Sequence, residues 1–319
     1  MSDRSAVISI GTNSTRLLAV DFAAKRFGVF GDPVTRILKA RSVGTRIGEG
    51  LKESGHLSEE AMQRTLEVAQ DYYDAINSAL PELYVIATSA LRRADNAADF
   101  VDRIRQITDT DVEILDGAEE AKASFRGAIT SFDDSEKLCA GVIDVGGGST
   151  EYAVGEHEHA VKSVSCEVGA VRVTEWFPAL SGREGFVDNA AIDAAREKTL
   201  ALLDPISSFP KAEALAIVGG SATTALAVVR GHPVRFGDAE LTREKLRAAL
   251  NMLCELPLAK RRTVPGMNPQ RADILPAGML ILDTAMELLG HDRATVSYND
   301  LLLGYLLLQR EKTGELNVV

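Results

Sequence analysis

A run of three glycines flanked by two carboxylates is the part of this sequence best suited to chemistry. Asp144 lies near the end of an apolar run, glycines occupy positions 146–148, and Glu151 precedes a second apolar run. Glycines have no Cβ, so successive backbone N–H groups can converge on one point and bind an anion, phosphate above all. The two carboxylates could hold a divalent cation that faces the phosphates. A plain glycine hairpin is the alternative interpretation.

The same stretch occurs twice in the chain. Residues 7–16 align with residues 142–151 without a gap, and the valine, isoleucine, glycine, serine and threonine positions are identical. The copies differ where the chemistry would take place, because Ser9 stands in the place of Asp144 and Arg16 in the place of Glu151. Copies this far apart indicate two related half-molecules, each opening with a hairpin, rather than a short-period repeat.

The hydrophobic pattern predicts strands that alternate with helices, which is typical of an α/β architecture. The expected strands of the first meander are Val7–Ile10, Leu17–Phe22 and Phe27–Phe30. Residues 34–51 are basic and rich in turn formers, and Ala160–Cys166 is expected to complete a second meander after the glycine hairpin. The helix expected at Ala272–Leu289 contains Pro276, which predicts a bend there.

Two adjacent carboxylates, Glu119 and Glu120, fall in the first turn of a helix that opens at Asp116 or Gly117. The ordinary reason for acids in this place is the helix dipole, which stabilises them by about 0.3–1 kcal/mol. The functional alternative is that one of them faces the glycine hairpin, orients a water molecule and accepts its proton.

Basic side chains occur at two places where a polyanion could be held. Arg92 and Arg93 follow a predicted strand, Leu83–Ala87, and ligands of α/β sheets commonly bind at strand ends. Residues 260–262, Lys-Arg-Arg, form the second basic cluster. A solvated turn and a solvated helix face are the respective alternatives. A second glycine turn, residues 219–223, either binds an anion at a helix N-terminus or is a close-packed strand–helix turn.

Composition narrows the class of protein. The 319 residues allow two domains, and the net charge of −11 argues against nucleic acid or an anionic membrane as a partner. Cys139, Cys166 and Cys254 lack metal-ligand spacing and are expected to be buried free thiols. Neither a signal peptide nor a membrane span is indicated, so we expect a cytoplasmic location.

Several motifs then follow the order found in the exopolyphosphatase / guanosine pentaphosphate phosphatase (Ppx/GppA) family, which this chain resembles along nearly its whole length. The motifs are Ile8–Ser14, Arg46–Leu51, Ala87–Arg92, Gly117–Ala121, Ile143–Glu151, Gly219–Thr223 and Arg271–Gly278. The resemblance implies two ribonuclease-H-like domains of the actin / sugar kinase / heat-shock-70 superfamily, with a cleft between them. It places the first domain at 1–116 plus 300–319 and the second at 117–299.

The resemblance also implies roles for individual residues. Glu120 matches the catalytic carboxylate that deprotonates the attacking water, and Asp144 and Glu151 match the acidic pair that holds Mg²⁺. A monovalent cation is a further candidate cofactor. The positions that match phosphate-binding residues are Gly146, Gly147, Gly148, Ser149, Asn13, Ser14, Arg16 and Arg92. The implied reaction removes orthophosphate from the end of inorganic polyphosphate, or converts pppGpp to ppGpp, and a homodimer is a candidate assembly.

One departure from the family pattern keeps other functions in view. The family usually has aspartate where this chain has Ser9, and the missing carboxylate removes a contact to metal or water. A non-hydrolytic sensor of polyphosphate or of the alarmone is therefore the alternative function. An ATP-dependent sugar kinase of the same superfamily is a third hypothesis.

Overall fold

The computed structural model describes residues 4–22, 36–77, 82–132, 139–234 and 239–314. The chain divides into two compact units, Met1–Glu120 with Tyr305–Val319 and Ala121–Gly304. The family resemblance predicts domain boundaries at 116/117 and 299/300, which differ from the boundaries of these units at 120/121 and 304/305. Two helices, α5 (Gly117–Ala128) and α12 (Leu301–Lys312), continue from one unit into the other.

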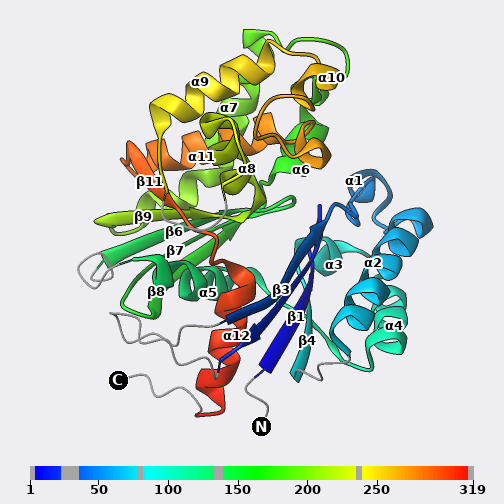
Figure 1. Ribbon diagram of the computed structural model, residues 1–319. Helices are drawn as coiled ribbons and strands as arrows, with labels where there is room; N and C mark the ends of the chain where they lie inside the picture. The colour runs from blue at the N-terminus through cyan, green and yellow to red at the C-terminus, as the bar shows by residue number, and fades with distance from the viewer. Residues whose placement is uncertain (1–3, 23–35, 78–81, 133–138, 235–238, 315–319) are drawn as a thin grey trace. The chain divides into compact units, whose positions relative to one another are not determined.

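The first unit contains a five-stranded mixed sheet with the order β3-β2-β1-β4-β5 (Figure 1). Its strands are β1 (Arg4–Ile10), β2 (Thr15–Asp21), β3 (Arg36–Val43), β4 (Glu82–Ala87) and β5 (Val112–Ile114). The first three strands pair antiparallel, and β1, β4 and β5 pair parallel. Parallel neighbours need a helical crossover, which the helices between β4 and β5 supply.

Helices cover both faces of the first sheet. The helices that precede α5 are α1 (Leu51–Ser54), α2 (Glu59–Asn77), α3 (Ser89–Arg93) and α4 (Ala97–Thr108). One core joins Ile8 and Leu17 of the sheet to Tyr72 of α2 and Phe100 of α4. The C-terminal part of α12 packs through Tyr305, whose hydroxyl donates to the Glu113 carboxylate.

The second unit contains a six-stranded sheet with the order β10-β11-β9-β6-β7-β8. Its strands are β6 (Ala140–Val145), β7 (Thr150–Glu156), β8 (His159–Cys166), β9 (Ala214–Val218), β10 (Ala239–Thr242) and β11 (Arg293–Val296). The antiparallel meander β6-β7-β8 followed by the parallel strands β9 and β11 repeats the order of the first sheet. The α/β architecture and the two related halves are therefore confirmed.

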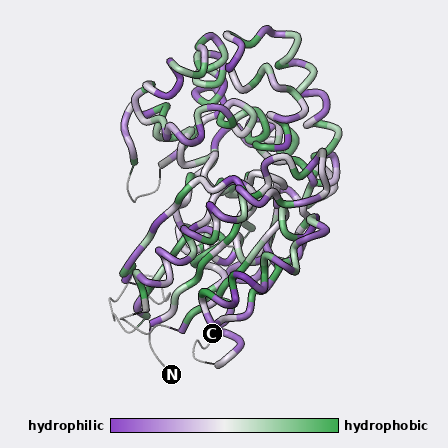
Figure 2. The backbone as a smooth tube through the Cα atoms, turned by 90° about the vertical axis from the view of Figure 1, so that its right-hand side faces the viewer, coloured by the Kyte–Doolittle hydropathy of each residue, from purple (hydrophilic) through white to green (hydrophobic). Residues whose placement is uncertain are grey.

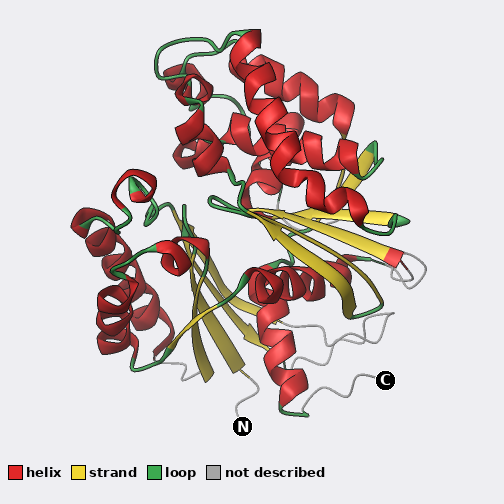
Figure 3. Cartoon of the chain, turned by 180° about the vertical axis from the view of Figure 1, so that it is seen from behind, coloured by secondary structure: helices red, strands yellow, loops and turns green. Residues whose placement is uncertain are grey.

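The helices of the second unit lie mainly on one face of its sheet, as Figure 3 shows with helices in red and strands in yellow. They are α6 (Ala170–Trp176), α7 (Asn189–Leu203), α8 (Gly219–Arg230), α9 (Arg243–Cys254), α10 (Leu258–Arg261) and α11 (Leu275–Leu288). Helix α11 is apolar on nearly all sides because it lies in the centre of this layer. On the other face, Phe125 of α5 packs against Val142 and Ala153. Figure 2 shows hydrophobic and hydrophilic stretches alternating along the chain in both units.

Two local predictions are wrong. The first is the turn-rich stretch, because residues 36–43 form strand β3. The strand expected at Phe27–Phe30 lies outside the described residues and stays a prediction. Strand β3 lacks an alternating hydrophobic pattern because it is a sheet edge, largely exposed on both sides, where charged residues prevent further strand pairing. Helix α11 begins at Leu275, so Pro276 lies in the first turn, where its missing N–H has no helical partner and does not bend the helix.

The basic cluster at 260–262 contains a buried arginine. Arg261 is fully buried, so it lies neither on a solvated face nor on a surface that could follow a polyanion. Its Nε donates to the carbonyl of Leu253 at 2.7 Å, and its Nη1 donates to the carbonyl of Leu180 at 2.6 Å. Burial lowers the pKa of Arg261 below its ordinary value. The guanidinium therefore ties the end of α9 to the segment that follows α6.

Candidate active site

The two related hairpins close in the same way. The amide of Gly11 donates to the carbonyl of Ser14 at 3.0 Å, and the amide of Gly146 donates to the carbonyl of Ser149 at the same distance. The strands beside them also match in register, because Ser9 lies opposite Arg16 and Asp144 opposite Glu151. The internal repeat in the sequence is thus a repeat of backbone geometry.

The triglycine loop of the second unit is held by the start of α6. The amides of Ala170 and Val171 donate to the carbonyls of Gly146 and Gly147, each at 2.9 Å. These bonds use loop carbonyls and involve none of the loop's own amides, so they are compatible with an anion that the amides would bind. The hydroxyl of Thr150 fixes the other side by donating to the carbonyl of Val168 at 2.6 Å.

Substitution of Gly169 by alanine is expected to displace this loop. A Cβ at Gly169 would lie 2.5 Å from the carbonyl carbon of Gly147 and 2.6 Å from the amide nitrogen of Gly148, both of which are backbone atoms. The alanine variant should release orthophosphate more slowly and should lose about 1–3 kcal/mol of stability. Turnover measures the first effect and denaturant unfolding the second. Gly290→Ala is the control for a loss of stability without displacement of the loop, since its φ of +71° strains an alanine while no atom lies within 4 Å of the added Cβ. Equal activity losses in the two variants would contradict this role of Gly169.

Asp144 and Glu151 form an opposed acidic pair on adjacent strands. Cross-strand partners point to the same face, and like charges in this arrangement repel each other. Glu151 is 3% exposed and Asp144 is partly exposed. Burial, together with the charge of Glu151, raises the pKa of the Cys166 thiol to about 11. A cation between the two carboxylates would relieve their repulsion.

The pair fits a magnesium ion better than a metal that needs an all-protein cage. Among the described residues, no group of three or more His, Cys, Asp or Glu side chains is arranged to hold a metal. Mg²⁺ commonly takes one or two carboxylates and completes its shell with water and substrate phosphates. The His157-Glu158-His159 sequence falls at the β7–β8 turn, where His157 has a φ of +51°, and belongs to no such group.

The structure separates the two glutamates at the start of α5. Glu119 is exposed and its carboxylate accepts from the amide of Asp116 at 2.8 Å, while the Asp116 side chain accepts from the amide of Glu119 at 2.8 Å. This reciprocal arrangement is a capping box. Glu120 is 6% exposed and pairs with the Arg92 guanidinium. Glu119 therefore has the capping role expected of an acid at the start of a helix. Capping does not explain why Glu120 is buried.

Arg92 lies beside Glu120 within the first unit. Its Nη1 also donates to the carbonyl of Leu115 at 2.6 Å, and the side chain is 20% exposed. The guanidinium has donors enough to serve these two acceptors and a phosphate oxygen as well. Its role as a phosphate ligand stays a prediction.

The remaining predicted ligands lie on the first hairpin. Asn13 and Ser14 are buried, and the amide of Asn13 donates to the Ser14 hydroxyl at 3.1 Å. The other end of this amide, Oδ1, is buried without a hydrogen-bond partner among the described residues. Rotation of the amide by 180° would place an N–H₂ group there, because the two ends have the same shape. A buried polar atom in this state is uncommon and marks a place where a ligand could bind.

The second glycine turn is closely packed. Helix α8 begins at Gly219, whose φ is +86°, and a Cβ there would lie 2.6 Å from Oδ1 of Asp144. A Cβ at Gly220 would overlap the guanidinium of Arg271. The strand–helix interpretation therefore explains both glycines, and the turn brings Arg271 near the second unit's acidic pair.

Two side chains near the candidate site were not singled out from the sequence. They are Ser124 and Ser165, which bond to the acidic pair. The position of Ser165 on the strand beside Glu151 carried a usable signal, since side chains opposite each other across a strand pair share a face. The contact of Ser124 depends on how α5 packs on the sheet, which local sequence patterns do not determine.

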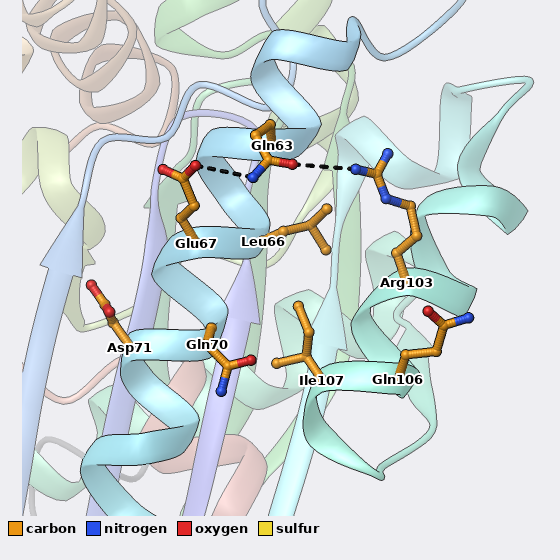
Figure 4. Close-up of a pocket in the computed structure, with 8 residues that line it drawn as sticks. All are labelled: Gln63, Leu66, Glu67, Gln70, Asp71, Arg103, Gln106 and Ile107. Carbon is orange, nitrogen blue, oxygen red and sulfur yellow. Dashed lines mark hydrogen bonds between the residues drawn. The ribbon is translucent and has the colours of Figure 1, made fainter.

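A groove of about 540 Å³ lies apart from these residues, between α2 and α4 (Figure 4). Gln63 donates to Glu67 at 3.0 Å and accepts from Arg103 at 3.4 Å, as the dashed lines show. Leu66 and Ile107 supply its apolar part. None of the predicted site residues lines this groove, so it is not a candidate for the chemistry.

The fold defines the class of protein. The repeated sheets identify two ribonuclease-H-like domains of the actin / sugar kinase / heat-shock-70 superfamily, and similar solved structures share this fold. An Aquifex aeolicus PPX-GPPA enzyme has a TM-score of 0.76 and 25% identity, covering 96% of this chain and 99% of its own. An exopolyphosphatase from Cytophaga hutchinsonii has a TM-score of 0.84 and 23% identity, covering 97% and 98%.

The chain belongs to the Ppx/GppA phosphatase family, whose model matches residues 30–307. It is 30% identical to Exopolyphosphatase 2 of Mycobacterium tuberculosis, over 95% of this chain and 98% of that protein. It is 28% identical to the bifunctional 3-dehydroquinate synthase/phosphatase of Fusobacterium nucleatum. That match covers 95% of this chain but 46% of the relative, so the chain spans about half of that protein's length. None of the helices in the described part of the chain is long and apolar enough to cross a bilayer.

Proposed function

We propose that this chain is an exopolyphosphatase that hydrolyses the terminal phosphoanhydride of inorganic polyphosphate and releases orthophosphate. The observation that carries the proposal is the triglycine loop of the second unit beside the opposed pair Asp144 and Glu151. Membership of a phosphatase family and the likeness to Exopolyphosphatase 2 support it. These relatives favour turnover over the non-hydrolytic sensor, although Ser9 replaces the usual aspartate.

In the proposed reaction, Glu120 accepts the proton of the attacking water. Asp144 and Glu151 would hold Mg²⁺, which would supply positive charge beside the phosphoryl oxygens. The amides of Gly147 and Gly148 and the hydroxyl of Ser149 bind the terminal phosphate and stabilise its developing charge, whereas the amide of Gly146 already donates to the carbonyl of Ser149 and closes the turn. Further phosphates are held by Arg92 and by the first hairpin through Asn13, Ser14 and Arg16.

The chemistry of the substrate determines how the proposal is tested. Long polyphosphate, short polyphosphate and pppGpp all end in a phosphoanhydride, so the triglycine loop alone does not distinguish them. Orthophosphate release from the three substrates should be compared in parallel. We expect turnover of polyphosphate with Mg²⁺ and none after chelation with EDTA, with activity restored by added Mg²⁺. Release from pppGpp alone would assign the chain to the alarmone, and tight polyphosphate binding without release would support the sensor.

A further inference from the structure

We infer that Ser124 and Ser165 are positioning residues that orient the acidic pair for a divalent cation. The inference rests on the proposed function, because it assigns the cation to Asp144 and Glu151. Neither serine contributes to the loop that would hold phosphate. Each one instead donates a hydrogen bond to one carboxylate of the pair, from a different element of the second unit.

Ser124 reaches the pair from α5. Its hydroxyl donates to Oδ2 of Asp144 at 2.6 Å, and the serine itself is 2% exposed. The other oxygen, Oδ1, lies against the start of α8, where it occupies the space beside Gly219. The two oxygens of Asp144 thus have different surroundings, which fixes the plane of the carboxylate. Loss of the hydroxyl would remove one of these two constraints.

Ser165 reaches the pair from β8. It lies directly opposite Glu151 across the β7–β8 pair, and its hydroxyl donates to Oε1 of Glu151 at 2.7 Å. An ionised carboxylate can only accept hydrogen bonds, so both serines must act as donors here. Each serine therefore supplies a neutral hydrogen-bond donor to one carboxylate of the pair.

Hydrogen-bond partners of metal-binding carboxylates orient their ligands, and their removal typically weakens metal binding 10- to 100-fold. In this chain the two carboxylates lie opposite each other in register, so a hydrogen bond to each one would hold both in the orientation that a shared cation needs. We therefore expect Ser124→Ala and Ser165→Ala each to weaken binding of a divalent cation about 10-fold. The threonine variants keep the hydroxyl and should restore most of the affinity.

The test is titration of the metal-free full chain with Mn²⁺, which accepts the same oxygen ligands as Mg²⁺, followed by electron paramagnetic resonance. Ser163→Ala is the matched control, because Ser163 lies on the same strand and face but opposite Ala153. Melting temperatures of the metal-free variants show whether each is folded. Unchanged Mn²⁺ affinity in both folded alanine variants, affinity lost equally in the control, or no Mn²⁺ binding by the wild type would overturn the inference.

Phosphate release, measured on the same preparations, distinguishes this inference from the proposed function. If the wild-type protein releases phosphate but neither alanine substitution changes the Mn²⁺ affinity, only the role of the serines is contradicted. Wild-type protein that binds Mn²⁺ in a serine-dependent way but releases no phosphate contradicts only the proposed hydrolysis.

Discussion

Glu120→Gln is expected to lower phosphate release from polyphosphate by about 10²- to 10⁴-fold, the usual contribution of a positioned general base. The amide keeps the shape of the side chain but cannot accept a proton from water. Glu120 is not used to cap α5, and the amide oxygen of glutamine can still accept the hydrogen bond from the partly exposed Arg92, so the variant should fold. Steady-state turnover and a melting curve measure the two properties separately.

Glu119→Gln is the matched control for this prediction. It changes the adjacent residue in the same way, on the same helical turn, but affects a capping carboxylate. We expect a stability loss of the order of 1 kcal/mol or less and nearly unchanged turnover. If Glu120→Gln turns over like the wild type, or if both variants lose activity equally, Glu120 is not the general base.

Asp283→Asn is expected to destabilise the protein by about 3–5 kcal/mol, because it removes the central charge of a buried ionic network. Asp283 is fully buried on α11 and accepts hydrogen bonds from Arg196, Arg243 and Arg247. These arginines come from α7 and α9, so the carboxylate joins three helices of the second unit. Denaturant unfolding of both proteins at neutral pH measures the difference.

Burial alone would raise the pKa of Asp283, but its hydrogen bonds to Arg196, Arg247 and Arg243 bring the pKa below its ordinary value of 3.8. A lowered folded-state pKa stabilises the fold above the unfolded-state pKa, and this stabilisation is lost as the pH falls through the folded-state pKa. The difference between wild type and Asp283→Asn should therefore be full at neutral pH and shrink below about pH 4.

Glu287→Gln is the control for the network. Glu287 lies one turn further along α11, contacts the same three arginines and is half-exposed, at 49%. An exposed ion pair contributes roughly 0–1 kcal/mol, so this variant should be nearly as stable as the wild type. A loss as large as that of Asp283→Asn, or a difference that does not depend on pH, would contradict this account of the network.

The sequence predicts the parts of the fold that repeat and the elements that bury one face. The two hairpins could be recognised because five identical residues recur at matching positions, and the structure gives both the same turn hydrogen bond. Strand β3 could not be recognised from its hydrophobic pattern, because an exposed edge strand has none. The burial of Arg261 could not be predicted from its charged neighbours either, because it depends on a carbonyl group that a distant segment brings to it.

The candidate site was predictable in its residue types but not in its local contacts. Asp116 and Glu119 have the spacing of a capping box, so the sequence held a signal that separates Glu119 from Glu120. The opposed register of Asp144 and Glu151 followed from a tight hairpin. The bond of Ser124 to Asp144 joins a helix to a strand, and only the packing of the second unit determines it.

Hydrolysis of long polyphosphate in ¹⁸O-labelled water tests the central claim most directly. Water that attacks the terminal phosphorus leaves its oxygen in the released orthophosphate, so mass spectrometry should find one ¹⁸O atom in each released phosphate. The remaining polymer should carry no label at its new end and should shorten without internal cuts. Absence of phosphate release by the wild-type protein, or label found in the polymer end instead of the released phosphate, would contradict the account.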